Sequence, residues 1–332
     1  MRPGLRYVIH EASGVGDARR GSVEFARTLG LGEVRQGEVA IIVTELASNL
    51  VKHAGGGEVL VRAVEQRAAP GLEILALDRG PGLARPAEML RDGYSTAGTS
   101  GTGLGAVRRL SAAFDLHSAP GLGTAVLARV EATPGGEAEA FDIGVVQVPY
   151  PGETVCGDGA TVSLSPDGVS VLVVDGLGHG IGANAAARAA RAAFDAAGAT
   201  DPAALLQAVH EGMRGTRGGV AGVAVVRPGH HEVVFSGMGN IGATVITDGS
   251  RRGLVSQNGT LGLTAPRGQA YTLPWTGHSV LVLHSDGLTS TWNPERYVGL
   301  LRKPAALIAG VLYRDHARGR DDVTVLVVKG TP

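Results

Sequence analysis

The stretch Val169-Ser-Val-Leu-Val-Val-Asp-Gly-Leu-Gly-His-Gly180 decides how the second half of this chain is interpreted. Its apolar residues 169–174 predict a buried strand, and that strand ends at the pair Asp175-Gly176. A second apolar run, 279–283, is followed in the same way by Asp286-Gly287. Aspartate followed by glycine is common turn chemistry, so one such pair alone indicates no more than a turn.

The places in this half where an aspartate stands next to a glycine or to a second aspartate include Asp158, Asp175, Asp286 and the pair Asp321-Asp322. Four carboxylates that converge after folding would form a site rich in oxygen atoms. Such sites suit hard divalent cations such as Mg²⁺ and Mn²⁺. The repetition therefore favours a cation site over four unrelated turns.

The rest of the second half is rich in strand-like runs, broken by alanine-rich segments. Helices are expected at 182–197, 202–214 and 304–314. Strand blocks interrupted by pairs of helices predict helices packed outside stacked sheets. The expected strands are 169–174, 220–226, 232–236, 243–247, 279–283 and 323–328.

A polar stretch of small residues, 131–140, marks the boundary between two domains. A chain of 332 residues is long enough for two, and Pro134 followed by two glycines interrupts both helix and strand. We therefore expect a first domain over 1–133, a linker over 134–140 and a second domain over 141–332.

Charge and apolar patterning argue against several classes of protein. The formal net charge of −1 provides no global field that would recruit nucleic acid or an anionic membrane. No apolar run approaches the roughly 20 residues that cross a bilayer, and the N-terminus carries charges where a signal peptide has an apolar core. The single cysteine, Cys156, excludes an intramolecular disulfide. We expect a soluble, cytoplasmic protein.

Three segments of the first half suggest a nucleotide site. The apolar spacing over 39–51 predicts a core-facing helix that carries Glu45 and Asn49 on one face. Asp78 follows the expected strand 72–77. The glycine-rich loop 98–105 leads into an expected helix, 105–112, whose N-terminus can bind phosphate. Taken singly, the Glu45–Asn49 pair could be a solvated helix flank and Asp78 an ordinary turn. The other expected strands are 58–64, 114–118 and 124–130.

In order and spacing, these segments resemble the N box and the two glycine boxes of the GHKL ATPases, and within them the serine kinases of the RsbT and anti-sigma-factor type. The resemblance covers about residues 5–130 and implies an α/β sandwich of the Bergerat type that binds ATP with Mg²⁺. It implies Glu45 as catalytic base, Asn49 as Mg²⁺ ligand and Asp78 as the residue that binds adenine. The implied site is completed by Gly80, Gly82, Gly101, Gly103, Gly105 and Thr124. Thr102 and Ala106 depart from the family, which has leucine there.

The aspartate series is similar to the SpoIIE or RsbX branch of the PPM phosphatases. The similar segments are Gly152-Glu153 with Cys156-Gly-Asp158, then 175–180, 285–287 and 320–324. The resemblance covers about 141–330 and implies an αββα sandwich that holds two Mn²⁺ or Mg²⁺ ions.

By that resemblance Asp175 bridges the two ions, and Asp175 and Asp286 count as catalytic because such a metal pair activates the attacking water. Asp158 and the Gly176 carbonyl serve one ion, and Asp286 with Asp321 the other. Larger family members carry a histidine directly after the bridging Asp-Gly, where this chain has Leu177. His179 either replaces it as general acid or stabilises the loop, and Cys156 is expected to have a packing or incidental role and not to act as a nucleophile.

Together the resemblances imply a bifunctional regulator of a bacterial partner-switching pathway, with a serine-kinase-type domain joined to a metal-dependent phosphoserine and phosphothreonine protein phosphatase. The implied partner is an STAS-domain protein, either an anti-sigma antagonist or its scaffold, and a homodimer through the first domain is compatible with the family. Two alternatives stay open for the first domain. It could bind a partner in the presence of nucleotide without transferring phosphate, or it could sense ATP and control the phosphatase.

Overall fold

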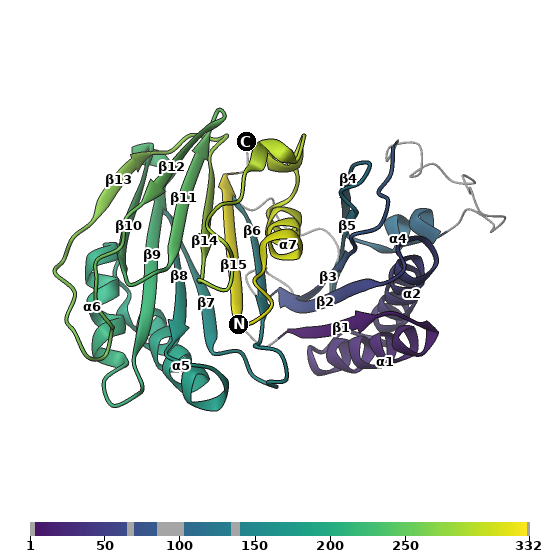
Figure 1. Cartoon of the computed structure of the whole chain (residues 1–332), viewed down its shortest axis with the longest axis horizontal. Coiled ribbons are helices and arrows are strands. Elements are labelled where there is room, and N and C mark those ends of the chain that lie inside the picture. Colours follow the sequence, from purple (N-terminus) through teal and green to yellow (C-terminus); the bar gives the residue numbers. More distant parts are fainter. Residues whose placement is uncertain (1–3, 65–69, 85–102, 134–139, 331–332) are drawn as a thin grey trace. The chain divides into compact units, whose positions relative to one another are not determined.

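The computed structural model describes residues 4–64, 70–84, 103–133 and 140–330, drawn as solid ribbon in Figure 1. Contacts divide the chain into two compact units. The first consists of Met1–Ala138 together with Asn293–Arg314, and the second of Glu139–Trp292 together with Asp315–Pro332. A segment near the C-terminus therefore belongs to the first unit, although sequence alone placed all of 141–332 in one domain.

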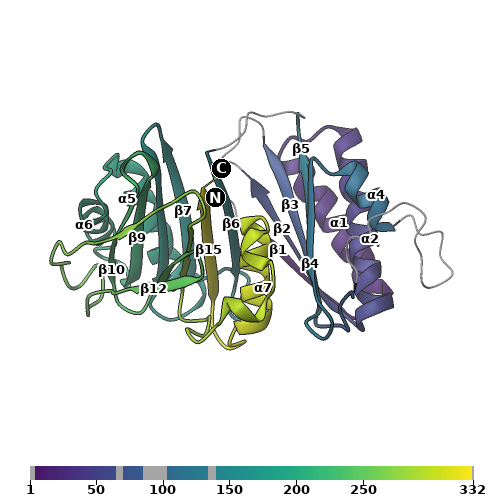
Figure 2. The same cartoon turned by 90° about the horizontal axis from the view of Figure 1, so that it is seen from above.

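The first unit is built on a five-stranded antiparallel sheet in the order β1-β2-β3-β5-β4. The strands are β1 (Leu5–Ile9), β2 (Gly57–Val64), β3 (Gly71–Leu77), β4 (Ala113–Ser118) and β5 (Thr124–Glu131). The helices α1 (Ala12–Thr28), α2 (Glu33–Asn49) and α4 (Gly103–Leu110) pack on one face of this sheet (Figure 2). The expected apolar stripe of α2 is buried, from Val39 to Ala47.

The opposite face of this sheet is also covered. Every residue of β3 is buried, which requires packing on both sides of the strand. Helix α7 (Ala305–His316) supplies contacts on this second face, because a Cβ added at Gly310 would lie 3.1 Å from the Leu77 side chain. Residues 305–314 of α7 are all buried. A helix that is buried on every side has apolar residues around its whole circumference, so its sequence does not indicate which sheet it packs against.

The second unit contains two five-stranded antiparallel sheets. One has the order β13-β10-β9-β8-β7, and the helices α5 (Gly180–Ala197) and α6 (Pro202–Gly212) pack against its central strands. The other has the order β12-β11-β14-β15-β6. The strands are β6 (Phe141–Val148), β7 (Asp158–Ser165), β8 (Gly168–Gly176), β9 (Gly219–Arg227), β10 (Glu232–Met238), β11 (Gly242–Thr247), β12 (Ser250–Leu254), β13 (Tyr271–Pro274), β14 (Val280–His284) and β15 (Val323–Gly330).

Most of the expected elements are confirmed to within a few residues, but several others were not predicted. Helix α1 buries only small residues, Ala18, Ser22 and Ala26, so its core-facing stripe carries a weak apolar signal. Strand β7 is exposed over its last residues and begins at a buried aspartate. Strands β1, β6, β12 and β13 were also missed. No helix among the described residues is long and apolar enough to cross a membrane.

Candidate functional site

The aspartate site of the second unit begins with a cross-strand pair. Asp158, the first residue of β7, lies directly opposite Asp175 of β8 in the antiparallel register. Side chains opposite each other on such a pair have Cβ atoms about 4.5–5.5 Å apart, and like charges there are destabilising. The two apolar strands therefore place two carboxylates side by side at the end of the sheet.

Two further aspartates, Asp286 and Asp321, lie close enough to Asp175 for their charges to raise its pKa. Burial, with the charges of Asp286 and Asp321 next in importance, raises the pKa of Asp175 to about 7. Burial followed by the neighbouring Asp175 raises the pKa of Asp158 well above its ordinary value. The pKa of Asp321 is raised by burial and then by Asp286. Residues from four distant segments thus lie close enough to repel one another.

Hydrogen bonds hold the outer members of this cluster in place. The backbone N–H of Tyr150 donates to Asp322 Oδ1 at 2.8 Å, and the Asp322 N–H donates to Asp321 Oδ1 at 2.9 Å. The Asn240 side chain donates through Nδ2 to Asp286 Oδ2 at 2.7 Å. Sequence reasoning missed Tyr150 and Asn240. Neither belongs to an Asp-Gly motif, and Tyr150 acts through its backbone.

The glycines beside these aspartates are required by close packing. A Cβ at Gly157 would lie 2.7 Å from Asp322 Oδ2, and a Cβ at Gly287 would collide with the Asp322 carbonyl. The amide of Gly176 donates to the Gly157 carbonyl at 3.2 Å. The Asp-Gly pairs therefore reflect segments that meet at the cluster as well as local turn preference.

The chemistry of this cluster fits divalent cations. Both carboxylate oxygens of Asp158 and Oδ2 of Asp322 are buried and make no hydrogen bond of ordinary geometry with the described residues, and the nearby Ser285 and Thr324 side chains only partly offset the raised pKa of Asp158. Burying a carboxylate without hydrogen bonds costs free energy, and a bound cation or proton would offset that cost. Within the described part of the chain, no three acidic, histidine or cysteine side chains already stand in ligating geometry, so cation binding would require side-chain adjustment.

His179 and Cys156 have contacts that suit structural roles. His179 Nδ1 lies 2.7 Å from Glu153 Oε1, and its ring stacks on Tyr150 with centroids 4.3 Å apart. Burial, then the charges of Asp158 and Asp322, strongly raises the pKa of the Cys156 thiol. A thiol held protonated in this way is a poor nucleophile.

The first unit brings together several of the expected nucleotide-site residues. Glu45 of α2 faces the start of α4, since a Cβ at Gly103 would lie 2.9 Å from Glu45 Oε2. Asn49 ends α2, and a π-helical turn, Leu50–Ala54, follows it. The loop after β3 reaches this turn because a Cβ at Gly80 would lie 2.7 Å from the Ala54 Cβ.

Asp78 is the best-anchored residue of this region. Its Oδ1 accepts hydrogen bonds from the backbone N–H groups of Gly80 and Thr124 at 2.8 and 3.0 Å. Its own N–H donates to the Thr124 carbonyl at 2.9 Å. Gly82 has a positive φ of 71° and passes close to the Ala119 carbonyl, where a side chain would collide. Gly105 is buried in α4, and Gly101 lies outside the described residues.

Comparison with known proteins identifies both halves of the chain. A model of the family "Stage II sporulation protein E (SpoIIE)" matches residues 165–330, which is half of the 332 residues. This chain belongs to the SpoIIE family. The other half of this SpoIIE-family protein, residues 10–130, matches the model described as "Histidine kinase-like ATPase domain".

A curated relative supports the assignment of the first half. The serine/threonine-protein kinase RsbT of Bacillus subtilis (strain 168) is 39% identical over 111 residues, which are 33% of this chain and 84% of RsbT. The SpoIIE-family protein therefore carries an RsbT-like ATPase domain ahead of its phosphatase domain.

Solved structures support the fold of the phosphatase domain. A chain from work on the bacterial stressosome as a modular system adapted to control secondary messenger signalling aligns with a TM-score of 0.54 and 26% identity, covering 57% of this chain and all of that one. RsbX in complex with magnesium aligns with a TM-score of 0.53 and 19% identity, covering 59% of this chain and 98% of RsbX. The second half of the chain thus has the fold of a PPM-type phosphatase.

The raised pKa of Asp175 predicts how stability depends on pH. Between pH 3.8 and about 7 the folded chain binds a proton at Asp175 that the unfolded chain has lost. In EDTA, the free energy of unfolding should therefore fall as pH rises through this window, by up to about 1.4 kcal/mol per pH unit for each such proton. Urea unfolding at a series of pH values measures the slope.

Asp175→Asn should reduce this slope because the amide does not titrate, whereas Asp167→Asn, at an exposed turn of the same domain, should leave it unchanged. At pH 8, Mn²⁺ should stabilise the unsubstituted protein, since the cation replaces the missing proton. Equal slopes for the unsubstituted protein and Asp175→Asn would contradict a raised pKa of this carboxylate.

Proposed function

We propose that the second unit is a protein phosphatase that uses two Mn²⁺ or Mg²⁺ ions to hydrolyse phosphoserine or phosphothreonine. The observation that carries this proposal is the convergence of carboxylates from two sheets: Asp158 and Asp175 from β7 and β8, and Asp286 and Asp321 from segments next to β14 and β15. Membership of the SpoIIE family and the RsbX-like fold support the same reaction.

The proposed cation ligands are Asp158, Asp175, the Gly176 carbonyl, Asp286 and Asp321. Two bound cations would lower the pKa of an attacking water and neutralise charge on the phosphoryl oxygens. The chain's own contribution is orientation: Asn240 fixes one oxygen of Asp286, and the Tyr150 amide fixes Asp322, which in turn holds Asp321. Groups that hydrogen-bond to a metal-ligating carboxylate in this way set the direction of its free oxygens.

For the first unit we propose an ATP-binding serine kinase with Glu45 as base, Asn49 as Mg²⁺ ligand and Asp78 as the adenine-binding residue. Gly80, Gly82, Gly101, Gly103, Gly105 and Thr124 would complete the nucleotide site. The position of Glu45 at the start of α4 supports this, because phosphate bound at that helix N-terminus would lie beside the carboxylate. The sequence identity to RsbT supports a domain that transfers phosphate over a domain that only binds nucleotide.

The proposed partner of both activities is one phosphoprotein of a partner-switching pathway, with an STAS-domain protein as the leading candidate. RsbT and the stressosome neighbour support this choice. Opposed activities on one chain would act on the same target at equal stoichiometry and at high effective concentration.

Removing a proposed cation ligand should abolish hydrolysis. For Asp286→Asn we expect Mn²⁺-dependent turnover of p-nitrophenyl phosphate and of a phosphoserine protein to fall by more than about 100-fold, because the amide carries no charge to hold the cation. Asp167→Asn is the matched control and should retain full activity. Normal turnover in Asp286→Asn, with circular dichroism equal to the unsubstituted protein, would refute the proposed site.

Phosphate transfer by the first unit is tested with γ-labelled ATP and a purified STAS-domain protein from the same genome. Label should appear on the partner and be lost with Glu45→Ala, while Glu33→Ala, at an exposed position on the same helix, should transfer normally. The chain used should carry Asp286→Asn so that its phosphatase does not remove the label. Retained ATP binding without label on any STAS partner would favour the binding-module or sensor alternative.

A further inference from the structure

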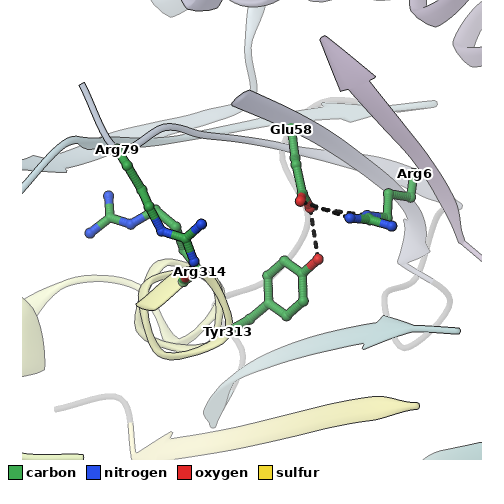
Figure 3. Close-up of polar contacts among 5 residues, drawn as sticks. All are labelled: Arg6, Glu58, Arg79, Tyr313 and Arg314. Carbon is green, nitrogen blue, oxygen red and sulfur yellow. Dashed lines mark hydrogen bonds and ion pairs between the residues drawn. The ribbon is translucent and has the colours of Figure 1, made fainter. Parts of the chain in front are cut away.

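The C-terminal end of helix α7 contacts the residue proposed to bind adenine. Figure 3 shows Arg314 and Tyr313 of α7 beside Arg79, Glu58 and Arg6, all within the first unit. Arg314 Nη1 donates to the main-chain carbonyl of Asp78 at 3.0 Å. The two residues lie 236 positions apart, and Arg314 falls inside the span that matches the SpoIIE family.

Arg314 completes the anchoring of Asp78. The Asp78 carboxylate is held through Oδ1, and its N–H is held by the Thr124 carbonyl. Its own carbonyl receives the Arg314 guanidinium. Each main-chain polar group of Asp78 therefore has a partner, which restricts the direction in which the remaining carboxylate oxygen, Oδ2, can point.

The contact is reciprocal. Arg79, the residue after Asp78, donates through Nη2 to the main-chain carbonyl of Arg314. Carbonyls in the last turn of a helix lack intrahelical donors, and a cation there also complements the negative end of the helix dipole. The Asp78–Arg79 segment and the end of α7 thus each satisfy a backbone carbonyl of the other.

Burial makes this contact electrostatically significant. Arg314 is only 5% exposed, and a guanidinium that is so buried needs fixed acceptors. Burial is the main cause that raises the pKa of Asp78, and the charge of Arg314 acts in the opposite direction. The arginine therefore favours the carboxylate form, which is the form that accepts a hydrogen bond from an amine.

A second contact fixes α7 independently of Asp78. Tyr313 Oη donates to Glu58 Oε2 at 2.7 Å, and Arg6 Nη2 donates to Glu58 Oε1 at 2.8 Å. Although burial is the largest influence on Glu58 and raises its pKa, these two partners hold that pKa below the usual value. Tyr313 thus docks the helix on β2 through a hydrogen bond in which Asp78 takes no part.

We propose that Arg314 is a positioning residue of the nucleotide site, which orients Asp78 for recognition of the adenine amino group. The inference rests on the proposed ATP-binding function of the first unit. It adds that this site includes a residue from the SpoIIE-matched part of the chain. Arg314 is followed within seven residues by Asp321, so helix α7 continues covalently into the proposed cation-binding segment.

The test uses the full chain, saturated with Mg²⁺, in isothermal titrations with ATP and separately with GTP. Guanine presents a carbonyl where adenine presents the amino group, so the ratio of the two Kd values reports how well Asp78 is oriented. For Arg314→Met we expect the Kd for ATP to rise about tenfold, the effect of losing one orienting hydrogen bond, and the preference for ATP over GTP to shrink. Arg314→Lys should restore part of that preference.

Tyr313→Phe is the matched control: it loosens the same helix and should leave the ATP-to-GTP ratio unchanged. If Arg314→Met does not fold, Arg314→Lys and Arg79→Met measure the same contact from its two sides. Equal loss of ATP and GTP binding in Arg314→Met and Tyr313→Phe would overturn the inference by making Arg314 merely structural.

Two further outcomes separate this inference from the proposed function. If Asp78→Asn loses ATP binding while Arg314→Met binds as the unsubstituted protein does, the nucleotide site stands and the role of Arg314 is refuted. If the unsubstituted protein binds no ATP, both are refuted.

Discussion

Electrostatic repulsion within a cluster of aspartates, of which Asp158 and Asp322 are buried, shapes the second unit. The pairing of β7 with β8 fixes Asp158 opposite Asp175, and neither can move away without breaking the sheet register. Asp286 and Asp321 arrive from other segments, and the glycines beside these acids allow the segments to meet. Such an arrangement opposes folding unless protons or cations balance it, and it is therefore a reason to expect function at this place.

The sequence predicted these carboxylates because each of the central two follows a long apolar run, a strong and local signal. It could not predict the residues that orient them. Asn240 lies outside any motif, and Tyr150 contributes only a backbone amide, which every residue but proline possesses. The contacts of His179 with Glu153 and Tyr150 likewise arise only after folding.

The sequence also could not predict which sheet helix α7 packs against. Ten residues of this helix, 305–314, are buried, so the helix is covered on all sides. An apolar surface does not specify which sheet covers it. The structure groups the helix with the RsbT-like unit, where Tyr313 and Arg314 supply specific polar contacts. A fragment that ends at residue 133 would lack this helix. The boundary drawn from the sequence therefore differs from the division of the chain by contacts, which places Asn293–Arg314 with the first unit.

The central claim, that the convergent aspartates bind divalent cations, is tested most directly by anomalous X-ray diffraction from crystals grown with Mn²⁺. We expect two anomalous peaks among Asp158, Asp175, Asp286 and Asp321. Manganese bound only elsewhere, with these four carboxylates free of the ion at saturating concentration, would contradict it.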